Sequence, residues 1–394
     1  MGSRKGLVRT VLAFVALAAC QGERAPASLR TDSAGVEIVR YPGADRPAPF
    51  SFVEDFRLGG SETIPEQSFF QVSAASIGSD ARGNLYILDS PGNRVLVFDG
   101  GGSFIRSMGR SGSGPGELGI PAGLVVSQDG SVGVVDFAKR GLVRFDTAGG
   151  PLPLMPLPPR YFGGAIRTAG DIMILPARQP VGDVGTDALL RIDGGDTAMI
   201  ALKPPSPMKA IELPSCGMGF SGMPPLFTPS LRWAANGERV AVVTGPDYDI
   251  ALFADGREVR RIRRDIAPAA ATEELALVEV GEAMEVRTEG GVRRCDPREV
   301  VEQRGVAATI PAVSSLSLSP DGWLWVLRGG VRDEPKPIDV FDPIGEYAGT
   351  LPAGSPFPLL FLPDGRIAAA ETDDLDVTRL VVYAVERPVS GEAR

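Results

Sequence analysis

A unit of two apolar strands joined by a tight glycine turn recurs six times along this chain and constrains its fold more than any other feature. The six copies lie at 75–89, 123–136, 164–175, 230–243, 314–327 and 358–370. Glycine tolerates the positive φ that tight hairpin turns require. A unit repeated in this way predicts an array of similar small sheets.

The first five copies continue into a third strand, a second turn and a fourth strand. These continuations lie at 94–108, 142–154, 189–202, 250–262 and 338–351. The sixth copy continues only to a third strand at 379–385, and its fourth strand is missing. The segment SFVEDFRLGG (51–60) is similar to SFIRSMGRSG (103–112), so we expect the N-terminal segment to complete the last sheet. Such an exchange closes a ring without an open sheet edge.

The pattern therefore predicts an all-β fold, a six-bladed β-propeller over residues 50–386 whose last blade is closed by the N-terminal strand. Residues 387–394 are predicted to be a C-terminal tail. The alternative is that the hairpins form some other sandwich. The units resemble NHL repeats, and the whole chain resembles bacterial six-bladed propeller lipoproteins of the broader TolB-like group. This resemblance implies the same propeller fold.

The linker GRSGSGPGELGIP (109–121) contains the glycine spacing of a dinucleotide-binding loop. That fingerprint must open a helix, but here Pro121 leads into another strand pattern. We therefore interpret the segment as a connection between blades, as in NHL-type repeats. Glu117 is expected to accept hydrogen bonds from the backbone amides of the glycine turn.

The N-terminus has the pattern of a signal peptide at 1–19. Basic residues precede the ten apolar or small residues of 10–19, which are too few to span a membrane. The run ends in Leu-Ala-Ala before Cys20 and resembles the bacterial lipobox. This resemblance implies acylation of Cys20 and a membrane anchor, on the periplasmic side of the outer membrane where a cell has two membranes. An ordinary signal peptide is the alternative, and residues 20–49 are predicted to be a flexible tether.

The long connections all belong to one side of the predicted propeller. They are 176–187, 203–229, 264–313 and 328–337. Elaborated loops on a rigid scaffold usually carry the binding function. The insertion at 264–313 is also expected to form a small helical cap over part of the propeller mouth, because Thr272 and Asp296 each begin a helical pattern.

Two further cysteines, Cys216 and Cys295, lie in neighbouring long connections on this side. An exported protein can form disulfides, so we predict a bridge between them, the alternative being two free thiols. Five residues are predicted as ligand contacts. They are Arg110, Glu117, Arg160, Tyr161 and Tyr248.

Composition limits the chemistry. The chain has no histidine, which removes Ser-His-Asp and Cys-His nucleophiles and His-ligated zinc. Its net charge of −9 does not favour nucleic-acid binding. No catalytic residue, cofactor or metal ligand is assigned.

Two functions are consistent with these features. The first is a monomeric, membrane-anchored extracytoplasmic protein that acts as a non-catalytic binding or scaffold propeller, with a protein, peptide or glycan bound at the insertion face. The second is a carboxylate- and metal-dependent hydrolase or lactonase of the gluconolactonase-like type. A purely structural envelope protein cannot be separated from the first by sequence.

Overall fold

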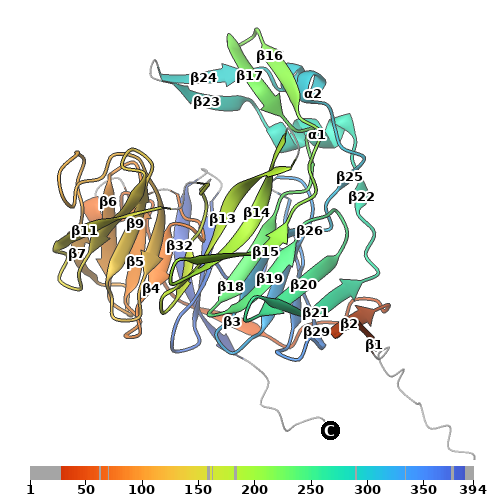
Figure 1. Cartoon of the computed structure of the whole chain (residues 1–394), viewed down its shortest axis with the longest axis horizontal. Helices are drawn as coiled ribbons and strands as arrows, with labels where there is room; N and C mark the ends of the chain where they lie inside the picture. The colour runs from red at the N-terminus through yellow and green to blue at the C-terminus, as the bar shows by residue number, and fades with distance from the viewer. Residues whose placement is uncertain are drawn as a thin grey trace, which may run out of the picture.

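The strands of this chain are arranged in six sheets around a central channel (Figure 1). The computed structural model describes residues 28–386 except 62–63, 70, 158–159, 162, 182–183, 289–290, 333 and 374–376. Each blade contains four antiparallel strands that follow one another outwards from the channel, and the sheet of blade 4 continues into two further strands from the N-terminal segment. The predicted all-β six-bladed propeller is therefore confirmed.

The first three blades follow the chain without interruption. Blade 1 comprises β4 (Ile77–Ser79), β5 (Leu85–Asp89), β6 (Arg94–Phe98) and β7 (Phe104–Met108). Blade 2 comprises β8 (Pro121–Val126), β9 (Val132–Asp136), β10 (Gly141–Phe145) and β11 (Pro151–Pro156). Blade 3 comprises β12 (Arg167–Ala169), β13 (Ile172–Val181), β14 (Val184–Asp193) and β15 (Asp196–Leu202).

The other three blades include the chain closure. Blade 4 contains β18 (Arg232–Asn236), β19 (Arg239–Val243), β20 (Asp249–Ala254) and β21 (Arg257–Arg264). Blade 5 contains β26 (Val313–Leu318), β27 (Leu324–Arg328), β28 (Ile338–Phe341) and β29 (Tyr347–Leu351). Blade 6 contains β30 (Leu360–Phe361), β31 (Ile367–Thr372), β32 (Thr378–Glu386) and the N-terminal β3 (Ser51–Leu58).

The predicted ring closure is present. β3 pairs antiparallel with β32, from Ser51 opposite Glu386 to Leu58 opposite Leu380. Both Leu58 and Leu380 are buried, at 2% and 0% exposure. A strand from the N-terminal region and the last strand of the described chain therefore meet in one sheet.

Neighbouring blades pack through the two faces of each strand. In β5, Leu85 and Ile87 belong to the apolar cluster shared with blade 6, whereas Tyr86 and Leu88 belong to the cluster shared with blade 2. Successive side chains of a strand point to opposite faces. A strand between two other blades is therefore buried at every position, as LYILD is, and its four apolar residues lack the alternation of a half-exposed strand.

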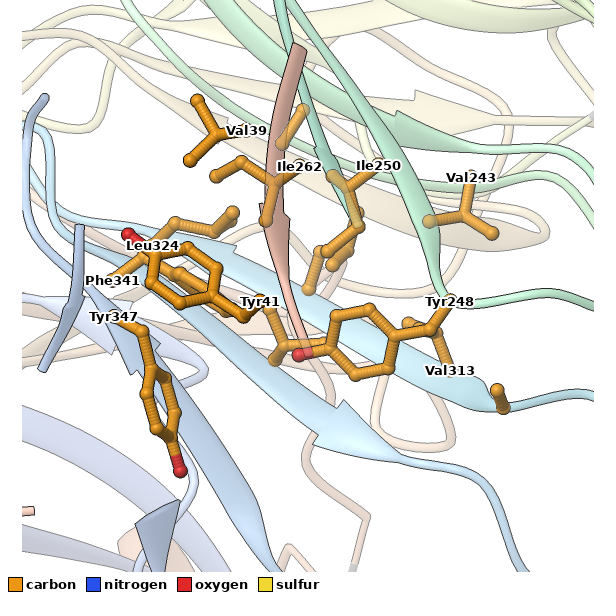
Figure 2. Close-up of a cluster of buried hydrophobic side chains, with 14 of the residues drawn as sticks. Val39, Tyr41, Val243, Tyr248, Ile250, Ile262, Val313, Leu324, Phe341 and Tyr347 are labelled. Atoms are coloured by element: carbon orange, nitrogen blue, oxygen red, sulfur yellow. The ribbon is translucent and has the colours of Figure 1, made fainter. Parts of the chain in front are cut away.

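The predicted tether of residues 20–49 requires correction from residue 29 onwards. β1 (Leu29–Ser33) and β2 (Val36–Tyr41) form a hairpin, and β2 pairs in parallel with β21 at the outer edge of blade 4. Val39 and Tyr41 enter the apolar cluster between blades 4 and 5, beside Phe341 (Figure 2). Burial of these two side chains and the open edge of β21 explain why this segment is ordered.

A second correction concerns residues 176–187, which were predicted to be a loop. They continue β13 and β14 as one long hairpin, with Pro176 opposite Leu189 and Pro180 opposite Gly185. Prolines are tolerated in a strand where their missing N–H group leaves no ladder bond broken.

The remaining elements lie outside the six blades. They are the 3-10 helix η1 (Pro65–Gln67), the strands β16 (Lys209–Leu213), β17 (Met218–Met223), β22 (Ala269–Ala270), β23 (Met284–Thr288), β24 (Gly291–Cys295) and β25 (Thr309–Ile310), and the helices α1 (Glu273–Val280) and α2 (Pro297–Arg304). No helix in the described part of the chain has the length and apolar composition needed to cross a membrane.

Candidate functional site: the insertion module and the propeller mouth

The two longest connections between blades fold together into one unit, which we call the insertion module (residues 209–223 and 269–310). The first segment supplies the β16–β17 hairpin, and the second supplies α1, the β23–β24 hairpin and α2. The module stands beyond the ends of the blade strands, at the top of Figure 1. The predicted helical elements are present, but they form part of a projecting unit with its own strands.

The module has an apolar core separate from the blades. Its buried members are Ile211, Leu213, Leu226, Ala276, Val280, Cys295, Val300 and Val301. Residues from both connections contribute to this core. Their association explains how two loops separated by the whole of blade 4 form a single unit.

A disulfide joins the two segments and confirms the predicted pairing. Cys216 follows β16, Cys295 ends β24, and their Cα atoms are 4.8 Å apart. Next to this bridge, the Glu299 carboxylate accepts hydrogen bonds from the backbone N–H and the hydroxyl of Ser215. The β16–β17 turn is thus attached to the end of β24 by a covalent link and to α2 by a polar one.

The helix caps are as predicted. The Thr272 hydroxyl accepts from Leu275 N at 3.3 Å, and the Asp296 carboxylate accepts from the N–H groups of Arg298 and Glu299 at 2.9 and 3.1 Å. These bonds satisfy donors that have no partner inside the helix. Two short helices are thereby fixed at their starting residues.

A cavity of about 240 Å³ lies between the insertion module and the propeller, and we call it the junction cavity. Arg232, at the start of β18, and Arg304, at the end of α2, line it together with Glu279. Among the described residues, neither arginine has a carboxylate within ion-pair distance. Desolvation by the surrounding protein lowers the pKa of both guanidinium groups, and the charge of Glu279 partly offsets this for Arg232.

The module is also attached to the long connection 329–337 of blade 5. The Glu279 carboxylate accepts a hydrogen bond from Arg332 N at 2.7 Å, and β22 pairs with β25 at the base of the module. Leu226 pairs with Val306 across the same base. The module is therefore held against the propeller at several points.

Of the predicted contacts, Arg110 and Glu117 interact with each other. Arg110 Nε donates to Glu117 Oε1 at 3.0 Å, and Gly114 N donates to Glu117 Oε2 at 2.7 Å. The bond from Gly114, followed by that from Arg110, lowers the pKa of Glu117. The expected role of Glu117 in the glycine turn is confirmed, whereas 81% of the Arg110 side chain remains exposed.

Arg160 and Tyr161 lie beside the long hairpin of blade 3 and form hydrogen bonds within the protein. Arg160 Nη1 donates to Gln179 Oε1 at 2.6 Å, and the Tyr161 hydroxyl donates to Gly164 O at 2.7 Å. Burial raises the pKa of Tyr161 to about 12. Both residues therefore have partners within the protein, and their role as ligand contacts stays a prediction.

Tyr248 is only 2% exposed and lies in the apolar cluster shown in Figure 2, and its role as a ligand contact stays a prediction. Its hydroxyl donates to Asp339 Oδ2 at 2.8 Å. Burial, followed by the nearby charge of Asp339, raises the pKa of Tyr248 far above its usual range. Its place in the apolar cluster of blades 4 and 5 makes it part of the scaffold.

Sequence analysis missed the ionic cluster around Asp339. This carboxylate is fully buried and accepts from Arg264 Nη1 at 2.8 Å and from Arg328 Nε at 3.0 Å. Asp45 of the N-terminal segment accepts from the same two arginines, at 2.9 and 2.6 Å. The cluster joins blade 4, blade 5 and the N-terminal segment. No local pattern connects Asp45 with residues more than 200 positions away.

Comparisons with known proteins agree on the fold. A family model described as "6-bladed beta-propeller" matches residues 71–153, which cover most of blades 1 and 2. A comparison with curated protein sequences finds no match.

Two solved structures have a similar fold. A predicted exported protein from Bacteroides fragilis NCTC 9343 is 15% identical with a TM-score of 0.53, over 89% of this chain and 100% of that one. A member of the DUF4221 family from Bacteroides vulgatus is 9% identical with a TM-score of 0.53, over 87% of this chain and 100% of that one. At such low identity the likeness concerns the fold alone.

Proposed function

We propose that this protein is a membrane-anchored extracytoplasmic propeller that binds a protein, peptide or glycan through the insertion module. The observation that carries the proposal is the module itself, a unit with its own core and disulfide that the propeller does not need to close its ring. Loops elaborated on one side of a rigid scaffold are common sites of binding.

The extracytoplasmic location has two supports. The Cys216–Cys295 disulfide is typical of oxidising compartments. Residues 1–19 and Cys20, which lie outside the described residues, have the pattern of a lipoprotein signal. We place the repeats in the NHL-like and TolB-like group on their sequence.

The module presents exposed apolar side chains that a partner would cover. Val278 on α1 and Val292 on β24 are each 52% exposed. Ile344, on the turn between β28 and β29 of blade 5, is 59% exposed and serves as a control of similar exposure outside the module. Apolar residues that remain exposed on a projecting unit are frequent contributors to interfaces.

The test is quantitative crosslinking in intact cells. The wild-type chain, the double variant V278E/V292E and the control I344E are compared by the proteins or glycans recovered from the envelope. We expect V278E/V292E to lose a partner that wild type and I344E retain, and Cys20→Ser to move the protein from the membrane to the soluble fraction. Identical recovery with V278E/V292E and wild type would refute the role of the module.

A further inference from the structure

The central channel contains a cavity of about 440 Å³, which is distinct from the junction cavity. The innermost strands of the blades form its wall, together with the segment 357–361 that precedes and includes β30. A cavity of this volume is within the range of small-molecule sites. Its lining is the basis for a ligand site separate from the partner surface proposed above.

One cation, Arg167 of β12, enters this cavity from blade 3. Arg167 Nη2 donates to Ala74 O at 2.8 Å, which lies just before blade 1, and Nη1 donates to Ile166 O at 3.3 Å. The guanidinium therefore links blade 3 to the segment that precedes blade 1. No carboxylate of the described residues lies within ion-pair distance of it. Most of the other arginines in the blades form ion pairs with carboxylates, as Arg264 and Arg328 do with Asp339.

The one carboxylate in the cavity wall is already bonded elsewhere. Asp80 is 1% exposed and accepts from the N–H groups of Arg82 and Asn84, from the Asn84 amide and from the Tyr86 hydroxyl. These bonds hold its charge in the turn between β4 and β5. Within the part of the chain that the structure describes, the positive charge of Arg167 thus has no carboxylate counter-ion.

Arg167 is partly buried, and a partly desolvated charge is stabilised by a partner of opposite sign. Desolvation lowers the pKa of Arg167, yet an arginine stays protonated in proteins. Of its five N–H donors, two are used by backbone carbonyls, which leaves three for a ligand. A bound anion would supply the missing charge and accept these bonds.

The rest of the lining is mixed, with polar side chains such as Gln128 and Asn236 beside apolar and aromatic ones. Trp233 on β18 and Phe357 and Phe361 before and within β30 border the same cavity. We propose that the central channel binds a small monocarboxylate, with the carboxylate at Arg167 and an apolar or aromatic body against these rings. A single cation matches a single negative charge, and the aromatic wall favours an organic anion over inorganic phosphate.

The junction cavity, like the channel, carries positive charge, because Arg232 and Arg304 border it. On β18, Arg232 borders the junction cavity and the next residue, Trp233, borders the channel cavity. On β26, Ser314 borders the junction cavity and Ser315 borders the channel cavity. Consecutive residues of β18 and β26 therefore border the two cavities. An anion that enters past Arg232 and Arg304 meets no unpaired carboxylate other than Glu279 among the described lining residues.

The test uses probes that differ in charge but not in shape. Binding of benzoate, phenylacetate and hexanoate to the purified protein is measured by calorimetry at constant ionic strength, with benzamide as the neutral counterpart of benzoate. We expect binding of at least one carboxylate, no detectable binding of benzamide, and roughly tenfold or greater loss of affinity in Arg167→Met. Arg257→Gln, which removes an exposed arginine of the outer strand β21 in blade 4, serves as the matched control and should bind as wild type does.

Two results would overturn the proposal. One is the absence of binding by all three carboxylates to the wild-type protein. The other is the absence of a charge effect, seen either as equal affinity of the wild-type protein for benzoate and benzamide or as equal affinity of wild type and Arg167→Met for benzoate. Arg167 would then have only its structural bonds to the segment before blade 1. Should Arg167→Met fail to fold, Arg167→Lys and the comparison of charged and neutral probes on wild type still decide the question. Partner recovery in the crosslinking experiment does not depend on any of these outcomes.

Discussion

Asp45 is a surface residue that stabilises the protein through ion pairs with two largely buried arginines. It bonds Arg264, whose side chain is 2% exposed, and Arg328, at 15%. These two arginines share a single buried carboxylate, Asp339, so Asp45 supplies the second negative charge of the cluster. The N-terminal segment is thereby held against blades 4 and 5 by charge as well as by β2.

This arrangement predicts a pH dependence of stability. The hydrogen bond from Arg328 lowers the pKa of Asp45 below its usual range, against the opposing effect of desolvation. A carboxyl with a lowered folded-state pKa stabilises the protein above its unfolded pKa of about 3.9, and this contribution is lost as pH falls through the folded value.

We therefore expect Asp45→Asn to be less stable than wild type at neutral pH, with a difference that shrinks as the pH falls below about 4. Urea unfolding of both proteins across this range provides the measurement. Asp265→Asn, which disrupts an exposed pair with Arg40, is the control and should change stability by under about 1 kcal/mol. A difference between Asp45→Asn and wild type that stays constant with pH would contradict the assignment.

At the scale of elements, the insertion module depends on two segments that are distant in the chain. The Cys216–Cys295 bridge closes a loop with a sequence separation of 79, which contains the whole of blade 4. On the chain-entropy model, such a bridge contributes about 4 kcal/mol. The module should be the first part of the molecule affected by its loss.

Reduction of the bridge is expected to expose the module core while the blades stay folded. Hydrogen exchange should increase in β16, β17 and α2 after reduction, and in the double variant C216S/C295S without reduction, while β9 and β10 remain protected. Titration of thiols in unfolded protein should find this pair only after a reductant is added. Equal protection of the module with and without the bridge would show that its core alone maintains the fold.

For the whole molecule, stability depends on closure of the ring by β3. Leu58 is 2% exposed and packs with blades 6 and 1, whereas Val53 on the same strand is 53% exposed. Leu58→Ala is expected to reduce the free energy of unfolding by roughly 2–5 kcal/mol, because it leaves a cavity at the joint. Val53→Ala, the control, should cost far less.

Chemical denaturation with two probes, one in blade 6 and one in blade 3, measures this effect. We expect both probes to report one transition, which shifts to lower denaturant in Leu58→Ala. If only the blade 6 probe shifted, the blades would unfold independently and the ring would not act as one cooperative unit.

The repeats alone predicted the six blades and the closure, because each blade is a local unit of consecutive strands with its own turns. The caps at Thr272 and Asp296, and the role of Glu117, were also predictable, since their partners lie within three residues. The pairing of Cys216 with Cys295 followed from topology, which places neighbouring connections on one side. All of these inferences rest on short-range patterns or on the symmetry of the repeat.

Other features depend on contacts between segments far apart in the chain. VEIVRY alternates only weakly, and it became β2 because β21 offered an unpaired edge and a pocket for Tyr41. The position of Tyr248 in the core, the cluster of Asp45 with Asp339 and the unpaired charge of Arg167 follow from how the blades meet. A sequence pattern specifies a strand and its faces, but burial and charge pairing depend on which other strands close over it in space.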